Sequence, residues 1–354
     1  MGDLNAALGE RLRRRWRAAA ISSGVLLAAS LSVHCSSDAP APSPAGAGFA
    51  AGGDSAGGGP PAGGNAGAGG AISAMWTMNG GKYSLTLGST YLELDPANGA
   101  RMTALRVGGS TGPNLLADSV ATGQVDNWGS TFWPSPQNWA WPPTDVGSIN
   151  AINTLPYSAV SDPLTLTLTS QVNATAPTVS VSKKFSADLA KQAIVIEYTM
   201  TNGGTAPVTV APWEITRVAA GGITFYADAS APSAVLPPTT LMDGVRWYQH
   251  DPSAVAQPAK ILSDGKGWIA HAAGDLLLIK SFPDLTPAQS PTGEAEIEIY
   301  ADPKYVEVEN QGAVQTLAPM EALHWTVRWY ARKLAAPAVV GSADLVAYVQ
   351  SQIQ

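Results

Sequence analysis

The sequence predicts an all-β protein whose body is one large antiparallel β-sandwich. The clearest strand signal is the run 164–169, which alternates Leu and Thr with the period of two that is typical of a half-buried strand. More than a dozen short segments of this general kind follow along the chain, separated by turn sequences such as Asp-Pro-Ala-Asn-Gly at 95–99. The sequence has neither long Leu/Glu/Lys blocks nor an alternation of strands with helices, which argues against helical bundles and parallel sheets.

The first 35 residues have the order of an export signal. Five arginines between positions 11 and 17 precede a largely apolar run from Ala18 to Val33, and Cys35 follows this run. The run is shorter than the roughly 20 residues that a membrane-spanning helix needs, so an uncleaved anchor is the weaker interpretation. Cys35 is the only cysteine of the chain, and an intramolecular disulfide is therefore impossible.

A lone cysteine at this boundary resembles the end of a bacterial lipoprotein signal, in which the cysteine becomes the lipidated N-terminus. The segment 31–35 reads Leu-Ser-Val-His-Cys, with His34 where a small residue is usual. The resemblance implies that a lipid on Cys35 anchors the protein to a membrane of the bacterial cell envelope. Because Ser36 follows the cysteine, the outer membrane is the expected place, and plain secretion is the alternative.

Residues 36–74 are expected to be a disordered linker. Between positions 36 and 71, 28 residues are Gly, Ala or Pro, and the only charges are Asp38 and Asp54. A segment with so little to bury stays flexible.

The sandwich is expected over residues 75–335 as one domain, since no break interrupts this part of the sequence. A tail, 336–354, follows it, and there Ser342 can cap a short helix with Leu345, Val346, Val349 and Ile353 on one face. Strands are expected at 82–88, 90–95, 100–107, 164–169, 178–185, 193–200, 206–211, 222–227, 267–271, 275–281, 294–301, 304–309 and 323–333.

Charge and motifs exclude several classes of function. The chain has 20 basic and 27 acidic residues, a net charge of −7, and without residues 1–34 it keeps 15 basic and 25 acidic residues. So acidic a protein, without a basic patch, is not expected to bind nucleic acid. The sequence contains no His-Glu-x-x-His motif, no phosphate-binding Gly-Lys-Ser/Thr loop and no nucleophile elbow. We therefore expect no cofactor, and no spacing of acidic residues argues for a calcium site or another metal.

Several segments resemble the galactose mutarotase-like proteins. The segments 91–95, 99–105 and 114–116 resemble their opening strands, and 305–309, 317–321 and 323–330 follow one another in the order of their closing part. Met320 stands in the 317–321 turn where a glycine is usual. The segments 129–137 and 211–216 also resemble an uncharacterised mutarotase-like family known as DUF4380. The resemblance spans about residues 80–333 and implies a β-supersandwich with a carbohydrate-binding surface.

The same resemblance implies catalytic roles. A mutarotase opens a sugar ring with a carboxylate base and an imidazole acid, and the base maps onto Glu309. Glu307 lies two residues away on the same strand face, so a pair of merely solvated carboxylates is the competing interpretation. The position of the acid is matched by Trp213, which cannot replace an imidazole, and standard mutarotase chemistry is therefore not expected.

Two other residues are candidates for the missing acid. Glu214 would stand opposite Glu309, as paired carboxylates do in sugar chemistry, with Arg217 holding it through a charge-assisted hydrogen bond. His250 lies in a loop-like segment that is placed to reach a site, whereas His271 and His324 lie in expected strands and are expected to be structural.

A cluster of aromatic residues carries the second signal for a site. Flat rings on proline-stiffened loops can stack on sugar faces, although buried rings would merely cover the sandwich. We expect about two of the five rings at a ligand, with Trp133 or a neighbour forming the wall of a site that Trp213, Glu214 and Glu309 share. The five residues are Trp128, Phe132, Trp133, Trp139 and Trp141.

Three functions stay open at this level. The first is a carbohydrate-binding envelope lipoprotein, whose partner is a mono- or oligosaccharide. The second is a sugar epimerase, or another carbohydrate-active enzyme, with Glu309 as its base. The third is a structural envelope protein without a small ligand. The missing imidazole counts against the enzyme, and the clustered aromatic residues count against the structural protein.

Overall fold

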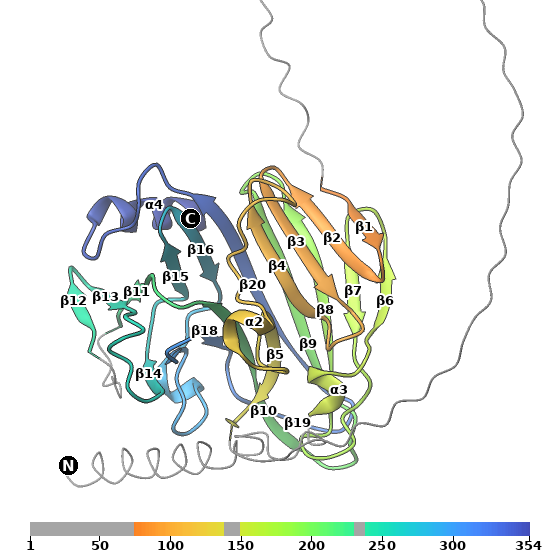
Figure 1. Ribbon diagram of the computed structural model, residues 1–354. Helices are drawn as coiled ribbons and strands as arrows, with labels where there is room; N and C mark the ends of the chain where they lie inside the picture. The colour runs from red at the N-terminus through yellow and green to blue at the C-terminus, as the bar shows by residue number, and fades with distance from the viewer. Residues whose placement is uncertain (1–73, 138–148, 230–237) are drawn as a thin grey trace, which may run out of the picture. The chain divides into compact units, whose positions relative to one another are not determined.

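Two antiparallel sheets make up the part of the chain that the structure describes, residues 74–137, 149–229 and 238–354 (Figure 1). The structure is a computed structural model, and all of its described residues belong to one unit, 72–354. The expected export signal with Cys35, and the expected linker as far as residue 73, lie outside the described residues. The predicted antiparallel all-β sandwich with a short C-terminal helix is confirmed.

The first sheet carries the opening strands of the domain at one edge and strands from its second half at the other. In spatial order it consists of β1 (Trp76–Asn79), β2 (Lys82–Leu87), β3 (Thr90–Asp95), β4 (Arg101–Val107), β5 (Ser130–Ser135), β10 (Val208–Ala219), β18 (Tyr305–Gln311), β17 (Ile297–Ala301) and β14 (Ala259–Ser263), and β19 (Gln315–Leu317) pairs with β10 off this path.

The second sheet faces the first, and the helices are short. In spatial order the sheet consists of β12 (Thr240–Met242), β13 (Val245–Gln249), β11 (Ile223–Ala227), β15 (Trp268–Ala273), β16 (Leu276–Ser281), β20 (Ala322–Lys333), β9 (Ala193–Asn202), β8 (Val179–Asp188), β7 (Leu166–Thr169) and β6 (Ser158–Ser161). The helices are α2 (Ser119–Thr122), α3 (Asn150–Asn153), the 3-10 turn η2 (Pro287–Gln289) and α4 (Ala343–Ile353).

Most of the expected strands lie within three residues of their expected bounds. The strand expected at 206–211 is an exception, because it continues as β10 as far as Ala219. Sequence reasoning missed seven short strands: β1, β5, β6, β12, β13, β14 and β19.

For Phe132 and Trp133, the missed strand β5 corrects the interpretation of the aromatic cluster as a proline-stiffened loop. Residues 130–135 form a fully buried strand in the middle of the first sheet, although Pro134 lies within it. Pro134 lies directly opposite Pro212 of β10, so the two residues that lack an N–H group face each other. On its other side β5 pairs with β4 at Ser130, away from Pro134. The prolines therefore sit where the ladder requires no donor from them.

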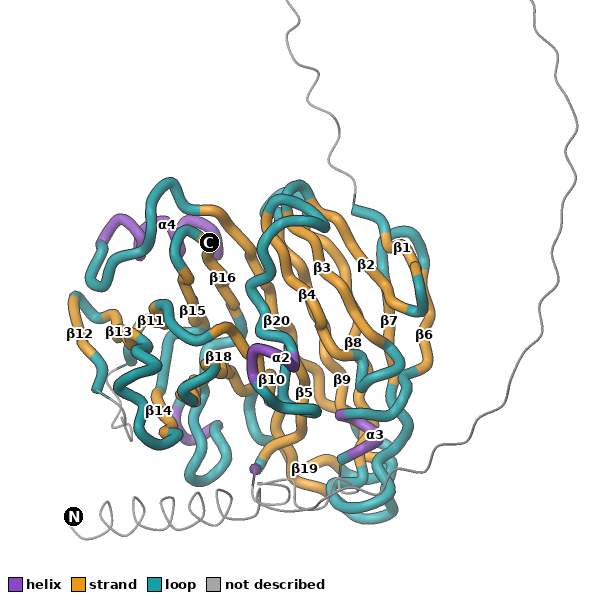
Figure 2. The backbone as a smooth tube through the Cα atoms, in the orientation of Figure 1, coloured by secondary structure: helices purple, strands orange, loops and turns teal. Residues whose placement is uncertain are grey.

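The main hydrophobic core fills the space between the two sheets. Phe132 of the first sheet stacks on Tyr198 of the second, with ring centroids 4.2 Å apart. A second apolar cluster lies on the other face of the second sheet, where Leu345 and Val349 of α4 pack among β11, β13, β15 and β16. Strands make up both layers, and the helices are short segments outside them (Figure 2). Among the described residues, no helix is long and apolar enough to cross a bilayer.

Candidate functional site

The outer face of the first sheet carries a dense group of polar and charged side chains. Successive side chains of a strand point to opposite faces, and Glu214 of β10 points at the second sheet, where it contacts Tyr198 and Trp329. Trp213 and Arg217 therefore point to the outer face. We call this group the carboxylate face: Trp133 of β5, Trp213 and Arg217 of β10, Glu307, Glu309 and Gln311 of β18, Glu298 of β17 and Lys260 of β14.

Glu309 lies at the centre of the carboxylate face and is completely buried. Its Oε2 atom accepts hydrogen bonds from Trp213 Nε1 at 2.6 Å and from Lys260 Nζ at 3.1 Å. Its Oε1 atom is buried and has no hydrogen-bond partner among the described residues. Burial raises the pKa of Glu309 to about 8, and the nearby Glu307 and Glu298 add to this rise while Lys260 opposes it. Near neutral pH this carboxyl group can thus either accept or donate a proton.

Lys260 binds two carboxylates of the face at once. Its Nζ atom lies 2.5 Å from Glu298 Oε2 and 3.1 Å from Glu309 Oε2, and 4.9 Å from the ring centre of Trp213. Burial alone lowers the pKa of Lys260, but the attraction of Glu298 and Glu309 outweighs it and raises that pKa above its ordinary value. Lys260 is therefore a fixed cation and not a proton donor for chemistry near neutral pH.

Arg217 forms the second ion pair of the face, and its partner differs from the predicted one. Its Nε donates to Glu307 Oε1 at 2.9 Å, and its Nη1 donates to Thr131 Oγ1 at 2.6 Å. The predicted bond from Arg217 to Glu214 is wrong, because Arg217 and Glu214 lie three positions apart in one strand and so point to opposite faces. Asn127, from the loop before β5, also donates to Glu307 Oε1, at 2.9 Å.

Three buried polar atoms of the carboxylate face lack a partner among the described residues. They are Glu309 Oε1 and Gln311 Oε1, which are acceptors, and Arg217 Nη2, which is a donor. A buried polar atom without a hydrogen bond costs on the order of 1–3 kcal/mol, so folded proteins keep few of them. Their gathering on one face makes the carboxylate face a candidate binding site.

Two of the expected aromatic residues border these atoms. Trp133 and Trp213 pack edge to face, with ring centroids 5.5 Å apart, and Trp133 Nε1 donates to Asn153 Oδ1 of α3. Trp128 is half-buried and lies against the guanidinium group of Arg101, at 4.9 Å.

Of the remaining predicted aromatic residues, Phe132 is described by the structure and does not join this group. Phe132 is a correction: it points into the core between the sheets, because its neighbour Trp133 takes the outer face. Trp139 and Trp141 lie outside the described residues.

The predicted grouping of Trp213, Glu214 and Glu309 holds only for Trp213 and Glu309. Glu214 lies in the core, where Tyr198 and Trp329 donate to it and Lys280 Nζ lies 2.8 Å from it. Glu214 therefore cannot act opposite Glu309.

His250 is also committed to the fold. Its Nδ1 accepts the backbone N–H of Gly221, and its Nε2 donates to the carbonyl oxygen of Asp302. With both ring nitrogens bonded to the backbone, His250 joins two chain segments instead of serving as an acid.

Sequence reasoning missed several residues of the face. Lys260 belongs to β14, a strand whose pattern was not recognised. Glu298 had a visible signal, since the run 294–298 reads Glu-Ala-Glu-Ile-Glu and places acidic side chains on one strand face. Gln311 follows Glu309 by two residues and shares its face for the same reason.

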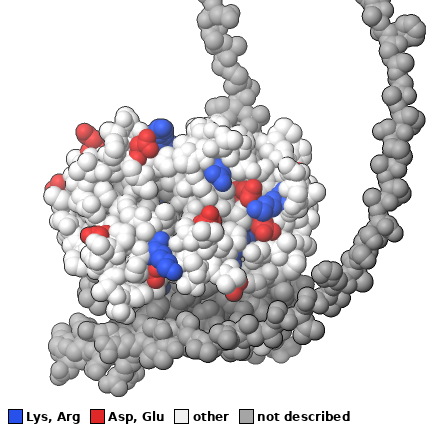
Figure 3. All heavy atoms as spheres, in the orientation of Figure 1, with Lys and Arg blue, Asp and Glu red and all other residues white. Residues whose placement is uncertain are grey.

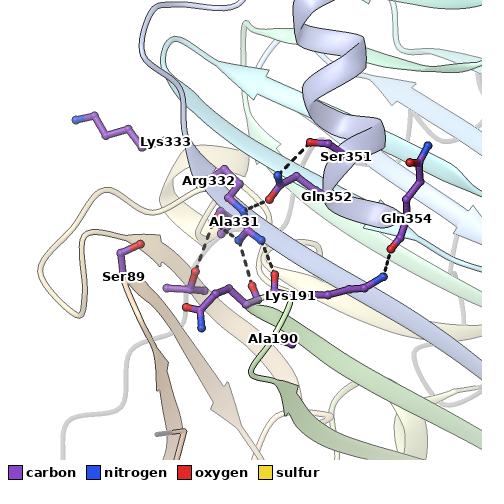
Figure 4. A pocket seen from close by; sticks show the side chains of 11 residues that line it. Ser89, Ala190, Lys191, Ala331, Arg332, Lys333, Ser351, Gln352 and Gln354 are labelled. Atoms are coloured by element: carbon purple, nitrogen blue, oxygen red, sulfur yellow. Dashed lines mark hydrogen bonds between the residues drawn. The ribbon is translucent and has the colours of Figure 1, made fainter. Parts of the chain in front are cut away.

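A separate cavity of about 530 Å³ lies between the β2–β3 turn, the β8–β9 turn, the end of β20 and the end of α4 (Figure 4). Arg332 lies along it but donates to Gln352, to the carbonyl oxygens of Lys191 and Gln192 and to that of Ala331. These donors serve the fold, so the cavity is a weaker candidate than the carboxylate face.

On the surface shown in Figure 3, basic side chains of the described residues lie singly among acidic ones.

Comparison with solved structures identifies the fold. A galactose mutarotase-like protein from Lactobacillus casei matches with a TM-score of 0.51 and 10% identity, over 71% of this chain and 100% of that chain. The fold is the galactose mutarotase-like fold. A putative aldose 1-epimerase from Escherichia coli (TM-score 0.42, 13% identity, 72% of this chain and 99% of that chain) and a galactose mutarotase related enzyme from Lactobacillus acidophilus (0.47, 7%, 73% and 100%) are more distant matches.

At the level of sequence, no protein-family model matches the chain, and no curated protein matches it significantly. The likeness to the galactose mutarotase-like fold is therefore one of architecture. The carboxylate face lies on strands β5, β10, β18, β17 and β14, which run from the middle of the first sheet to one of its edges.

Proposed function

We propose that the carboxylate face binds a carbohydrate. The observation that carries this proposal is a set of three buried atoms that the described residues leave unpaired, next to the indole rings of Trp133 and Trp213. The atoms are Glu309 Oε1, Gln311 Oε1 and Arg217 Nη2. A sugar presents hydroxyl groups, which both donate and accept hydrogen bonds, around a ring with apolar faces. The galactose mutarotase-like fold supports the proposal, because it gives a carbohydrate-related role a structural precedent.

A glycan array on the purified protein tests this proposal. We expect selective binding to one class of glycans, and we expect Glu309→Gln and Trp133→Ala to weaken it about tenfold or more, since each removes a contact of the binding face. Glu197→Gln is the matched control, because Glu197 is an exposed strand glutamate paired with Lys184. An array without any bound glycan would contradict carbohydrate binding and favour a structural role.

Sugar epimerisation is the second candidate, and one observation favours it. The pKa of Glu309, raised to about 8, and its Oε1 atom, which the described residues leave unpaired, are properties of a group that exchanges protons with a substrate. Against it, the position expected for an imidazole is taken by Trp213, and His250 is bonded to the backbone through both nitrogens. Polarimetry of an α-anomer decides: turnover that Glu309→Gln abolishes establishes an enzyme, and no turnover leaves a binding protein.

We also propose that the protein is a lipoprotein of the bacterial cell envelope, anchored through Cys35. The resemblance of residues 31–35 to a lipoprotein signal supports this, and the linker that follows would hold the sandwich away from the membrane. Metabolic labelling with a fatty-acid analogue is expected to mark the native protein and to fail with Cys35→Ser. Labelling of the Cys35→Ser variant would refute the anchor, and release of unlabelled native protein would indicate plain secretion.

A further inference from the structure

The two cations of the carboxylate face are both neutralised by the protein itself. Arg217 is fully buried and pairs with Glu307, while Lys260 pairs with Glu298 and Glu309. Glu294 adds another carboxylate at the edge, where it accepts a hydrogen bond from Gln311 Nε2 at 2.9 Å. A ligand on this face thus meets four glutamates and two cations that each have a carboxylate partner.

Arg217 nevertheless keeps one donor free. Its Nη2 atom is buried and unpartnered among the described residues, and its guanidinium group lies 5.5 Å from the ring centre of Trp133. Arg101 supplies a second guanidinium group nearby. Burial lowers the pKa of Arg101, and the positive charge of Arg217 lowers it further. The Nε atom of Arg101 is likewise buried without a partner among the described residues. Two arginines with free N–H groups would form an anion site if Glu307 carried no charge.

We propose that Glu307 determines the charge selectivity of the carboxylate face: by neutralising Arg217 it restricts the site to uncharged sugars and excludes uronate sugars. The proposal rests on carbohydrate binding at this face. Arg217 Nη2 then donates to a hydroxyl oxygen, while Glu309 Oε1 and Gln311 Oε1 accept from hydroxyl groups. A sugar carboxylate would instead lie beside the carboxylate of Glu307 in a buried environment, where the repulsion between two like charges is strong.

The first experiment needs no variant. An array carries three matched sets: neutral glycans, the corresponding uronate glycans, and the same uronate glycans as methyl esters. We expect the neutral and esterified sets to bind and the free uronates to bind at least tenfold more weakly, because the ester differs from the acid mainly in charge. Equal binding of acids and esters would overturn the selectivity and leave carbohydrate binding intact. No binding to any set would overturn both proposals.

The second experiment assigns the selectivity to Glu307. Glu307→Gln keeps the shape of the side chain and an acceptor for Arg217 and Asn127 but removes the charge. We expect the ratio of uronate to neutral affinity to rise about tenfold or more, because Arg217 is then able to pair with the uronate carboxylate. A thermal unfolding transition verifies that the variant is folded, and Glu197→Gln is expected to leave the ratio unchanged. A folded Glu307→Gln protein with the native ratio of uronate to neutral affinity would refute the role of Glu307. If the variant does not fold, the array of acids and esters still decides the selectivity.

Discussion

Glu214 and Glu309 are both fully buried glutamates on neighbouring strands, yet they have different surroundings. Both carboxylate oxygens of Glu214 are bonded, to Tyr198 on one side and to Trp329 and Lys280 on the other. Glu309 keeps one oxygen unpaired among the described residues. Burial alone therefore does not distinguish the two glutamates, whereas their hydrogen-bond partners do.

Lys280→Met tests the structural role of the core ion pair. The substitution leaves the carboxylate of Glu214 buried without its cation, and we expect the free energy of unfolding to fall by about 3–5 kcal/mol. Lys184→Met is the matched control, because Lys184 also pairs with a strand glutamate but both side chains are nearly half exposed. Chemical denaturation measures both variants. Adding Glu214→Gln to Lys280→Met should restore part of the loss, and equal losses in the two lysine variants would contradict the assignment.

At the scale of elements, the sequence predicts those strands and helices that depend on a local residue pattern. The alternation at 193–200 gives β9, and Ser342 starts α4 as expected, with its side chain accepting the N–H of Leu345. Strand β5 was missed because a proline within a segment is typical of a loop. Pro134 fits into the strand because it lies opposite Pro212. That pairing joins positions far apart in the chain, and nothing in the local sequence reveals it.

The candidate site, too, was predicted from the sequence only in part. The resemblance to the galactose mutarotase-like proteins anticipated that Trp213 and Glu309 lie together, and the pairing of β10 with β18 brings them into contact. The assignments of Glu214 and Phe132 failed on strand parity, since a shift of one residue moves a side chain to the other face of the sheet. Lys260 comes from a third strand whose pairing only the three-dimensional structure defines.

Ser342→Ala tests the cap of α4. The serine side chain accepts the backbone N–H of Leu345, and its loss should lower the free energy of unfolding by about 1 kcal/mol. Ser342→Asp should retain most of the stability, because an aspartate can accept the same bond and also interacts favourably with the N-terminus of a helix. Chemical denaturation gives the comparison. If alanine and aspartate at this position are equally stable, the cap contributes nothing measurable.

At the scale of the whole molecule, several titratable groups are buried, and they change the stability of the protein with pH in opposite directions. The pKa values of Glu309 and Glu296 are raised to about 8, first of all by burial. Each group binds its proton more tightly in the folded state than in the unfolded chain, where its pKa is about 4.5. The stability that these two groups contribute is therefore present below pH 4.5 and is lost as the pH rises through about 8.

His271 acts in the opposite direction. It is buried in β15, its Nδ1 lies 2.9 Å from Thr224 Oγ1, and burial, with a smaller contribution from His250, lowers its pKa to about 3. The unfolded chain takes up a proton at this histidine near pH 6.5, but the folded protein does so only near pH 3. His271 therefore costs the protein stability as the pH falls from 6.5 toward 3. We expect His271→Asn to flatten the decline of the unfolding free energy over this range, as measured by denaturation at a series of pH values. His324→Asn removes an exposed histidine and should follow the native curve, and a His271→Asn curve parallel to the native one would contradict the assignment.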